Sequence, residues 1–164
     1  MVAPALTQVG VTPAAAHMFI FYYAVLSEVS PPTALSPFAA AAITGGNPFR
    51  TTMISWKYVT PAFVVPFVFT LSSTGTGILL EGTVLQIITS SAAAAVGIAA
   101  LSAGISGWMR SHATIVERAL LVVAAVLLFL PHAAAKLAGV ALAGAVLVAH
   151  WRRADVPQTR GPHV

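Results

Sequence analysis

Long apolar runs with almost no charged residues limit what this 164-residue chain can fold into. Hydrophobic residues make up 58% of it and charged residues only 7%, whereas a soluble domain carries roughly 25% charged residues. So few charges could not cover a water-facing surface, and apolar blocks of this length are typical of bilayer spans. Unpaired backbone groups are costly in lipid, which favours helices, and the short alternating segments of a transmembrane barrel are not visible. We therefore predict an all-α polytopic membrane protein.

Polar and turn-forming residues divide the apolar sequence into five blocks, which we interpret as five helical spans. We expect them at about 17–44, 54–71, 83–107, 115–130 and 134–150. The pattern Thr114-Ile115-Val116-Glu117 before the fourth block is a capping box and predicts where that helix begins. From Trp151 the chain is polar, and we expect a frayed tail. The first ten residues lack the basic region of a signal peptide, and we expect them to continue from an earlier part of a longer protein.

The first block is interrupted at its centre by the segment Ser27-Glu28-Val29-Ser30-Pro31-Pro32-Thr33. Two adjacent prolines lack N–H donors and cannot continue a regular helix. The residue before a proline is also disfavoured in the helical conformation. We therefore predict a broken helix, with half-helices at about 17–27 and 34–44 joined by an unwound linker.

This linker places polar groups deep in an apolar block, and intramembrane ionisable groups are usually functional. An unwound stretch frees backbone carbonyls and hydroxyls add oxygens, which are the ligands that hard cations such as sodium prefer. The start of the second half-helix, about 33–36, would offer free N–H groups to an anion. The candidate substrate- or ion-binding residues are Ser27, Glu28, Ser30, Pro31, Pro32 and Thr33. The candidate sodium ligands are Ser27, Ser30 and Thr33.

The alternative interpretation of the linker is a proline kink that shapes packing only. We favour a functional site because two prolines, an acid and hydroxyl groups fall within seven residues. For Glu28 itself, a structural or electrostatic role is slightly favoured over direct ligation of an ion.

The basic residues predict an orientation, because lysine and arginine concentrate in cytoplasmic loops. Seven of the eight basic residues fall in alternate loops, and only Lys136 falls in the remaining ones. The three tryptophans, Trp56, Trp108 and Trp151, lie at span ends on that same side, as interfacial anchors do. We therefore expect the first block to enter from outside and the C-terminus to be cytoplasmic.

Several kinds of chemistry find no support in the sequence. The chain has no cysteine, and its five histidines show no metal-ligand spacing, so we assign none of them a function. We find no nucleophile elbow, paired-carboxylate motif or phosphate-binding glycine loop, and expect no enzyme activity. The net charge is +4, and the basic residues lie between apolar blocks, which favours a membrane over nucleic acid as the partner.

The run from His17 to Phe69 resembles the C-terminal part of the large permease of tripartite ATP-independent periplasmic (TRAP) transporters. In permeases of the fused type, associated with TAXI-type solute-binding proteins, a Phe/Tyr-rich half-helix precedes Ser-Asp-Ile/Val-Thr-Pro-Pro, an Ala-rich half-helix and Gly-x-x-Pro. Here Glu28 stands in place of Asp, Ser30 in place of Thr, and Thr33 where Val is common. The resemblance covers about residues 4–71, and residues 80–151 resemble more weakly the hydrophobic C-terminal extension of such permeases.

This resemblance implies a sodium-driven importer of small organic acids such as C4-dicarboxylates, in the bacterial inner membrane. The implied partners are membrane lipid, the rest of the permease and a periplasmic TAXI-type solute-binding protein. Sodium would be the coupling ion, and no other cofactor is implied. The corresponding domains are residues 1–72 as the end of the permease domain, 73–151 as a three-span extension and 152–164 as a polar cytoplasmic tail.

Residues 1–72 would hold only half of such a carrier's ion site, so we expect the chain to be inactive alone. The alternative is a small helical membrane protein with an accessory or assembly role and no transport activity. That alternative predicts no ion dependence at the linker.

Overall fold

The computed structural model describes residues 2–70 and 75–154, and these residues form helices joined by short connections. The α-helices are α1 (Val2–Gln8), α2 (Pro13–Leu26), α3 (Leu35–Thr44), α4 (Pro48–Thr70), α5 (Val84–Ser106), α6 (Ile115–Phe129) and α7 (Ala133–Ala154). Two 3₁₀ helices, η1 (Ser27–Val29) and η2 (Gly75–Leu79), lie between them. The prediction of an all-α class is confirmed.

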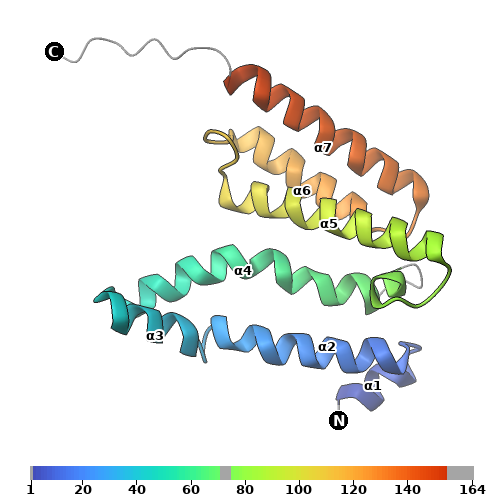
Figure 1. The fold of residues 1–164 in the computed structure, drawn as a ribbon, viewed down its shortest axis with the longest axis horizontal. Coiled ribbons are helices and arrows are strands. Elements are labelled where there is room, and N and C mark those ends of the chain that lie inside the picture. The colour runs from blue at the N-terminus through green and yellow to red at the C-terminus, as the bar shows by residue number, and fades with distance from the viewer. Residues whose placement is uncertain (1, 71–74, 155–164) are drawn as a thin grey trace.

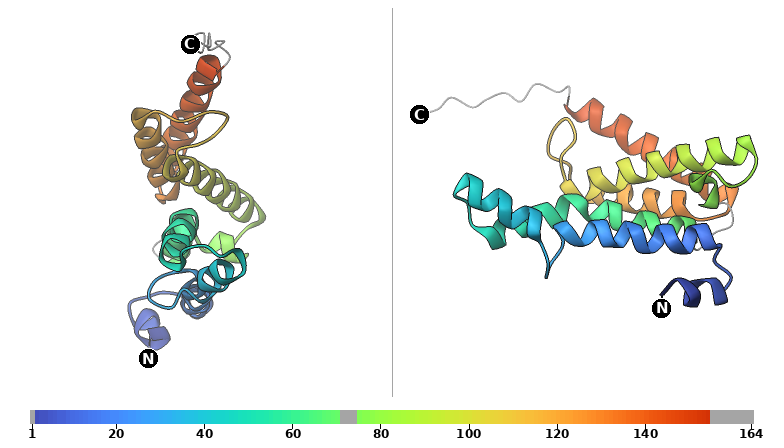
Figure 2. Two further views of the ribbon diagram at one scale, coloured as in Figure 1. Left: turned by 90° about the vertical axis from the view of Figure 1, so that its left-hand side faces the viewer. Right: turned by 60° about the horizontal axis from the view of Figure 1, so that its bottom comes forward.

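The long helices run up and down side by side, so that the chain reverses direction at each main connection (Figure 1). Helices α2 and α3 together form one pass, and α4 returns alongside both of them. Helices α5, α6 and α7 form a three-helix unit that packs against α4 mainly through α5. Seen from the side, the helices form an elongated stack with α1 at one edge and α7 at the other (Figure 2).

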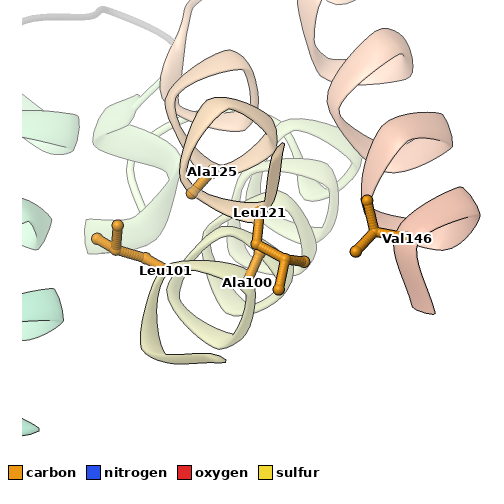
Figure 3. Packing of buried hydrophobic residues seen from close by; sticks show 5 residues of the cluster. All are labelled: Ala100, Leu101, Leu121, Ala125 and Val146. Atoms are coloured by element: carbon orange, nitrogen blue, oxygen red, sulfur yellow. The ribbon is translucent and has the colours of Figure 1, made fainter. Parts of the chain in front are cut away.

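The core of the three-helix unit is built from small and medium apolar side chains that let the helices approach closely (Figure 3). Its fully or nearly buried members are Ala100, Leu101, Leu121, Ala125 and Val146. A Cβ added to Gly104 of α5 would lie 3.0 Å from the carbonyl oxygen of Arg118 in α6. Small residues at such crossings are typical of packed membrane helices, because the bilayer supplies no hydrophobic drive between helices.

A second apolar cluster joins the N-terminal helices to α4. Ala15 of α2 is fully buried and packs with Val65 and Phe69 of α4. Phe19 of α2 meets Phe67 of α4 edge to ring, with the ring centroids 5.6 Å apart. This arrangement holds α2 against the second half of α4 and so fixes where α2 ends relative to α4.

Within residues 2–70 and 75–154, three helices, α4, α5 and α7, are long and apolar enough to cross a membrane. The other two predicted spans are shorter. Helix α6 has 15 residues, and α2 and α3 have 14 and 10. At 1.5 Å per residue a helix of 15 residues is about 22 Å long, less than the roughly 30 Å of the hydrocarbon core. The prediction of five spans therefore holds for three full-length helices, while the first pass needs α2, the linker and α3 in series.

The predicted helix boundaries differ from the observed ones mainly at the ends of the longest helices. Helix α4 begins at Pro48 rather than near 54, because proline is compatible with the first turn of a helix. Helix α7 extends to Ala154, so the first residues of the expected polar tail are helical. Residues 155–164 lie outside the described part of the chain. The short helix α1 was not predicted.

The basic residues gather at one end of the stack, as their sequence pattern suggests. The α3–α4 connection, the α5–α6 loop and the C-terminal end of α7 all lie at this end (Figures 1 and 2). Arg50 in the first turn of α4, Arg110 in the α5–α6 loop, and Arg152 and Arg153 near the end of α7 lie there, whereas Lys136 lies at the start of α7 at the opposite end. We call the first of these ends the basic end.

Candidate functional site

The predicted break in the first apolar block is present, with a helix on each side. Helix α2 ends at Leu26, one 3₁₀ turn follows, and Ser30 is extended with φ −111° and ψ 146°. Ala34 then adopts a left-handed conformation, φ 44° and ψ 35°, directly before α3. Positive φ costs energy for a residue with a Cβ, so the packing around the buried Ala34 must hold it there. We call residues 27–33 the linker.

The two prolines of the linker leave main-chain oxygens without local donors. A carbonyl in a helix accepts from the N–H three or four residues ahead. For Glu28 these positions are Pro31 and Pro32, and neither has an N–H. Only two linker carbonyls accept from main-chain N–H groups across the break, those of Ser27, from Ser30 at 3.4 Å, and of Ser30, from Ala34 at 3.0 Å. The sequence therefore creates free carbonyl oxygens at a defined point of the chain.

The three hydroxyls that we predicted as ligands differ in their surroundings. Ser27 Oγ donates to the Ala24 carbonyl oxygen at 2.7 Å, which leaves the lone pairs of that hydroxyl available. The hydroxyls of Ser30 and Thr33 have no hydrogen-bond partner within residues 2–70 and 75–154. Ser27 and Ser30 are half-buried, and Thr33 is exposed.

Glu28 is exposed, and its carboxylate has no hydrogen-bond or ion-pair partner among the residues that the structure describes. Pro31 and Pro32 are exposed as well. The 3₁₀ turn that carries Glu28 contacts α2, α3 and α4. The linker thus has one face against these helices and presents its acid and prolines on the other face, where no described residue covers them.

The start of α3 offers unpaired donors next to these oxygens. The first turn of a helix has N–H groups without intrahelical partners, and α3 has no side-chain cap at its N-terminal residue. Leu35 and Ser36 occupy its first two positions and both are exposed. Oxygen ligands for a cation and N–H donors for an anion therefore lie within one short segment.

A second polar cluster, which sequence reasoning did not find, lies at the basic end of the three-helix unit. His150 of α7 is fully buried, with its Nε2 3.2 Å from Ser111 Oγ and its Nδ1 3.4 Å from Glu117 Oε2. Arg153 donates to the same Glu117 oxygen at 3.0 Å and to the His112 carbonyl at 3.0 Å. Glu117 also completes the predicted capping box, accepting from the Thr114 N–H at 2.7 Å.

This cluster joins the α5–α6 loop, the start of α6 and the end of α7. The spacing of His150 and Arg153 places them on one face of α7, a signal that the sequence contained. The spacing does not reveal that Glu117 is their partner. Because His150 has no exposed surface, a substrate could not reach it, and the cluster is a structural tie.

The histidines and acids do not form a metal centre in the part of the chain that is described, where no group of three or more comes together. The candidate ligands in the linker are hydroxyl and main-chain carbonyl oxygens, which differ from the histidine and carboxylate ligands of such a metal centre. All six candidate residues lie together in the linker, and four of them, Glu28, Pro31, Pro32 and Thr33, are exposed.

Comparison with known proteins gives one match. Residues 1–76 match the family model described as "Tripartite ATP-independent periplasmic transporter, DctM component". A search of curated proteins and a search of solved structures each found no match. The matched residues contain α1 to α4 and the linker, while α5, α6 and α7 lie beyond the match.

Proposed function

We propose that this chain, whose residues 1–76 match the DctM family model, is part of a sodium-coupled permease of the TRAP type for small organic acids. In this proposal the linker contributes one half of the sodium site. The observation that carries it is the pair of adjacent prolines, which removes the local N–H donors of the Glu28 carbonyl, next to the hydroxyls of Ser30 and Thr33, which have no partner among the described residues. Discontinuous helices supply ion ligands in this manner in secondary transporters.

Sodium fits the linker better than a transition metal does, because the available atoms are hard oxygen donors without nitrogen or sulfur. The Glu28 carbonyl has no local donor, and Ser30 and Thr33 present free hydroxyls nearby. A negative charge on Glu28 would raise the affinity of the segment for a cation without direct ligation. One segment cannot surround an ion, so the remaining ligands come from other parts of the permease.

A small organic acid fits the start of α3. The exposed N–H groups at Leu35 and Ser36 lack a side-chain cap, and the positive end of the helix dipole favours a carboxylate there. A carboxylate at this position would lie next to the cation bound by the linker. Their mutual attraction gives a physical basis for coupling between sodium and substrate, because each stabilises the other when both are bound.

The proposal also includes partners outside this chain. The chain would work with the rest of the permease and with a periplasmic solute-binding protein of the TAXI type, in the bacterial inner membrane with its C-terminus in the cytoplasm. The division at residue 72 between permease domain and extension also remains a prediction. The competing hypothesis is a small membrane accessory protein, for which the linker is a packing kink and sodium has no effect.

The experiment uses a complete permease that carries this segment, reconstituted in proteoliposomes with its binding protein. Replacing Ser27, Ser30 and Thr33 together by Ala removes three hydroxyls and keeps the prolines. We expect the sodium concentration for half-maximal uptake to rise, because fewer oxygen ligands remain, although the main-chain carbonyls are still present. Replacing Pro31 and Pro32 by Ala should reduce uptake further, since a continuous helix would use the carbonyls for its own hydrogen bonds.

A matched control removes three hydroxyls outside the linker, one in α3 and two in α4. Thr44 and Thr60 each donate to a carbonyl of their own helix, at 2.9 and 2.8 Å, and Thr51 donates at 3.0 Å to the carbonyl of Asn47, directly before α4. The triple Ala variant of these residues should show the same dependence of uptake on sodium concentration as the unaltered permease. The linker variant and this control are compared at equal amounts of permease in the proteoliposomes. If uptake depends on sodium concentration in the same way in both, the linker hydroxyls are not ligands and the packing hypothesis is preferred.

A further inference from the structure

A groove at the basic end separates α4 from the start of α6. It has a volume of about 720 Å³ and is open to the surroundings of the protein. Its walls come from α4, α5 and α6. The lining residues are Lys57, Gly104, Ile105, Ile115, Arg118, Ala119, Val122 and Val123. The groove therefore combines two cationic side chains with an otherwise apolar wall.

The two cations are held in place by carbonyls at the C-terminal end of α5. Lys57 Nζ donates to the Ser106 carbonyl at 3.3 Å. Arg118 Nε donates to the Gly104 carbonyl at 2.9 Å, and its Nη2 to the Ile105 carbonyl at 3.2 Å. The last carbonyls of a helix lack intrahelical partners, so both side chains cap α5.

These contacts leave the positive charges available. A lysine ammonium has three donors and an arginine guanidinium five, so further N–H groups remain on both side chains. None of the residues that line the groove is acidic. The nearest acid in sequence, Glu117, is engaged by His150 and Arg153. The groove consequently has two cationic groups and no carboxylate to neutralise them.

The position of the groove matches the headgroup level of a bilayer. Trp108 follows the C-terminal end of α5, and Trp56 precedes Lys57 inside α4, beside that end of α5. Both indoles are exposed, with 61% and 46% of their surface accessible, and exposed tryptophans are typical of the membrane interface. The aliphatic wall formed by Ala119, Val122 and Val123 extends along α6 from this level toward the hydrocarbon core.

We propose that this groove binds an anionic phospholipid, with its phosphate on Lys57 and Arg118 and one acyl chain along Ala119, Val122 and Val123. The lipid would bridge α4, in the DctM-like part, and the three-helix unit. Basic pockets between membrane helices bind anionic headgroups in this way. The cationic side chains attract the phosphate, and the apolar wall contacts the acyl chain of the same lipid. The proposal does not depend on the transport function, since it concerns only this groove.

The test measures how much phosphatidylglycerol the full-length chain retains in detergent, by native mass spectrometry during a lipid titration. Phosphatidylcholine with the same acyl chains is the comparison lipid. Removing both charges, with Lys57→Gln and Arg118→Gln, should raise the half-saturating phosphatidylglycerol concentration by about tenfold or more, since each basic residue contributes about 1 kcal/mol to such binding. Glutamine keeps an N–H donor, so much of the α5 capping can persist.

A second variant tests the apolar wall without altering charge. Ala119 is exposed in the groove, so Ala119→Trp should fill the space for the acyl chain and weaken phosphatidylglycerol binding by a similar factor. Ala145→Trp, at an exposed position of α7, is the matched control and should bind as the unaltered chain does. The charge control is Lys136→Gln with Arg152→Gln, which removes two cations outside the groove.

Three outcomes would overturn the proposal. The first is equal retention of phosphatidylglycerol and phosphatidylcholine by the unaltered chain. The second is unchanged phosphatidylglycerol binding in both the charge variant and Ala119→Trp. The third is displacement of the lipid by millimolar inorganic phosphate, which would show a simple anion site. If the charge variant does not fold, Ala119→Trp against Ala145→Trp decides the question.

Discussion

The hydroxyl of Tyr23 in α2 donates a hydrogen bond of 2.7 Å to the main-chain carbonyl oxygen of Phe63 in α4. Tyr23 lies four residues before the linker, and its ring also packs on Phe63, with the ring centroids 5.8 Å apart. This contact fixes the end of α2 against α4 and so determines where the linker begins. It also ties a side chain to a carbonyl of a helix that contains Pro61 and Pro66.

Replacing Tyr23 by Phe should therefore destabilise the N-terminal part of the protein. The ring contacts persist and one hydrogen bond is lost, which costs about 0.5–1.5 kcal/mol. Tyr22→Phe is the control, because the half-buried Tyr22 hydroxyl has no hydrogen-bond partner among the described residues. Thermal unfolding of both variants in the same detergent provides the measurement. A Tyr22 variant that loses as much stability as the Tyr23 variant would contradict the role of this hydrogen bond.

The buried His150 should hold the end of α7 to the α5–α6 loop. In His150→Ala the Ser111 hydroxyl and the Glu117 carboxylate each lose a contact, and a cavity remains, so a loss of about 1–3 kcal/mol is expected. Peptide-level hydrogen exchange over residues 146–153 should become faster. His112→Ala is the control, because His112 is exposed and contributes only its main-chain carbonyl to Arg153. If hydrogen exchange is unchanged in His150→Ala, the ion pair of Arg153 and Glu117 is enough to hold the end of α7 without His150.

Two glycines of α7 should respond differently to the same substitution. A Cβ at Gly139 would lie 2.8 Å from Leu128 Cγ and 2.9 Å from the Ala124 carbonyl oxygen. Because the main chain of α6 cannot yield cheaply, Gly139→Ala should cost about 1–3 kcal/mol. A Cβ at Gly144 would meet nothing within 4 Å, so Gly144→Ala should be neutral or stabilise by up to about 1 kcal/mol. The comparison is made by thermal unfolding, and equal effects at both positions would argue against the close α6–α7 approach.

The clustering of basic residues at one end predicts the topology of the chain. Reporter fusions after Arg50, Arg110 and Arg153 should indicate the cytoplasm, because positively charged loops are retained there. Fusions near Ser73, outside the described residues, and near His132 should indicate the outer side. A fusion after Arg153 that reports the outer side would contradict this orientation and remove one of the predicted spans.

The sequence by itself determined the class of the protein, the position of the break and the start of α6. Long apolar blocks with few charges are stable in a membrane. In lipid, a helix provides hydrogen bonds for the N–H and C=O groups of its own main chain. Pro31 and Pro32 stop the helix through a local cause, the missing N–H groups, so neighbours were not needed to predict the linker. The capping box at Thr114 and Glu117 is local in the same sense.

Only the tertiary structure decided which distant residues meet. Glu117 and His150 are 33 residues apart, and Lys57 and Ser106 are 49 apart, so no local pattern pairs them. The same limit applies to proline. Pro61 and Pro66 remain inside α4, where both are buried against neighbouring helices, whereas the adjacent prolines of the linker end a helix. Local chemistry sets where a helix can stop, and packing between helices sets whether it does and what lies beside it, because packing depends on residues far along the chain.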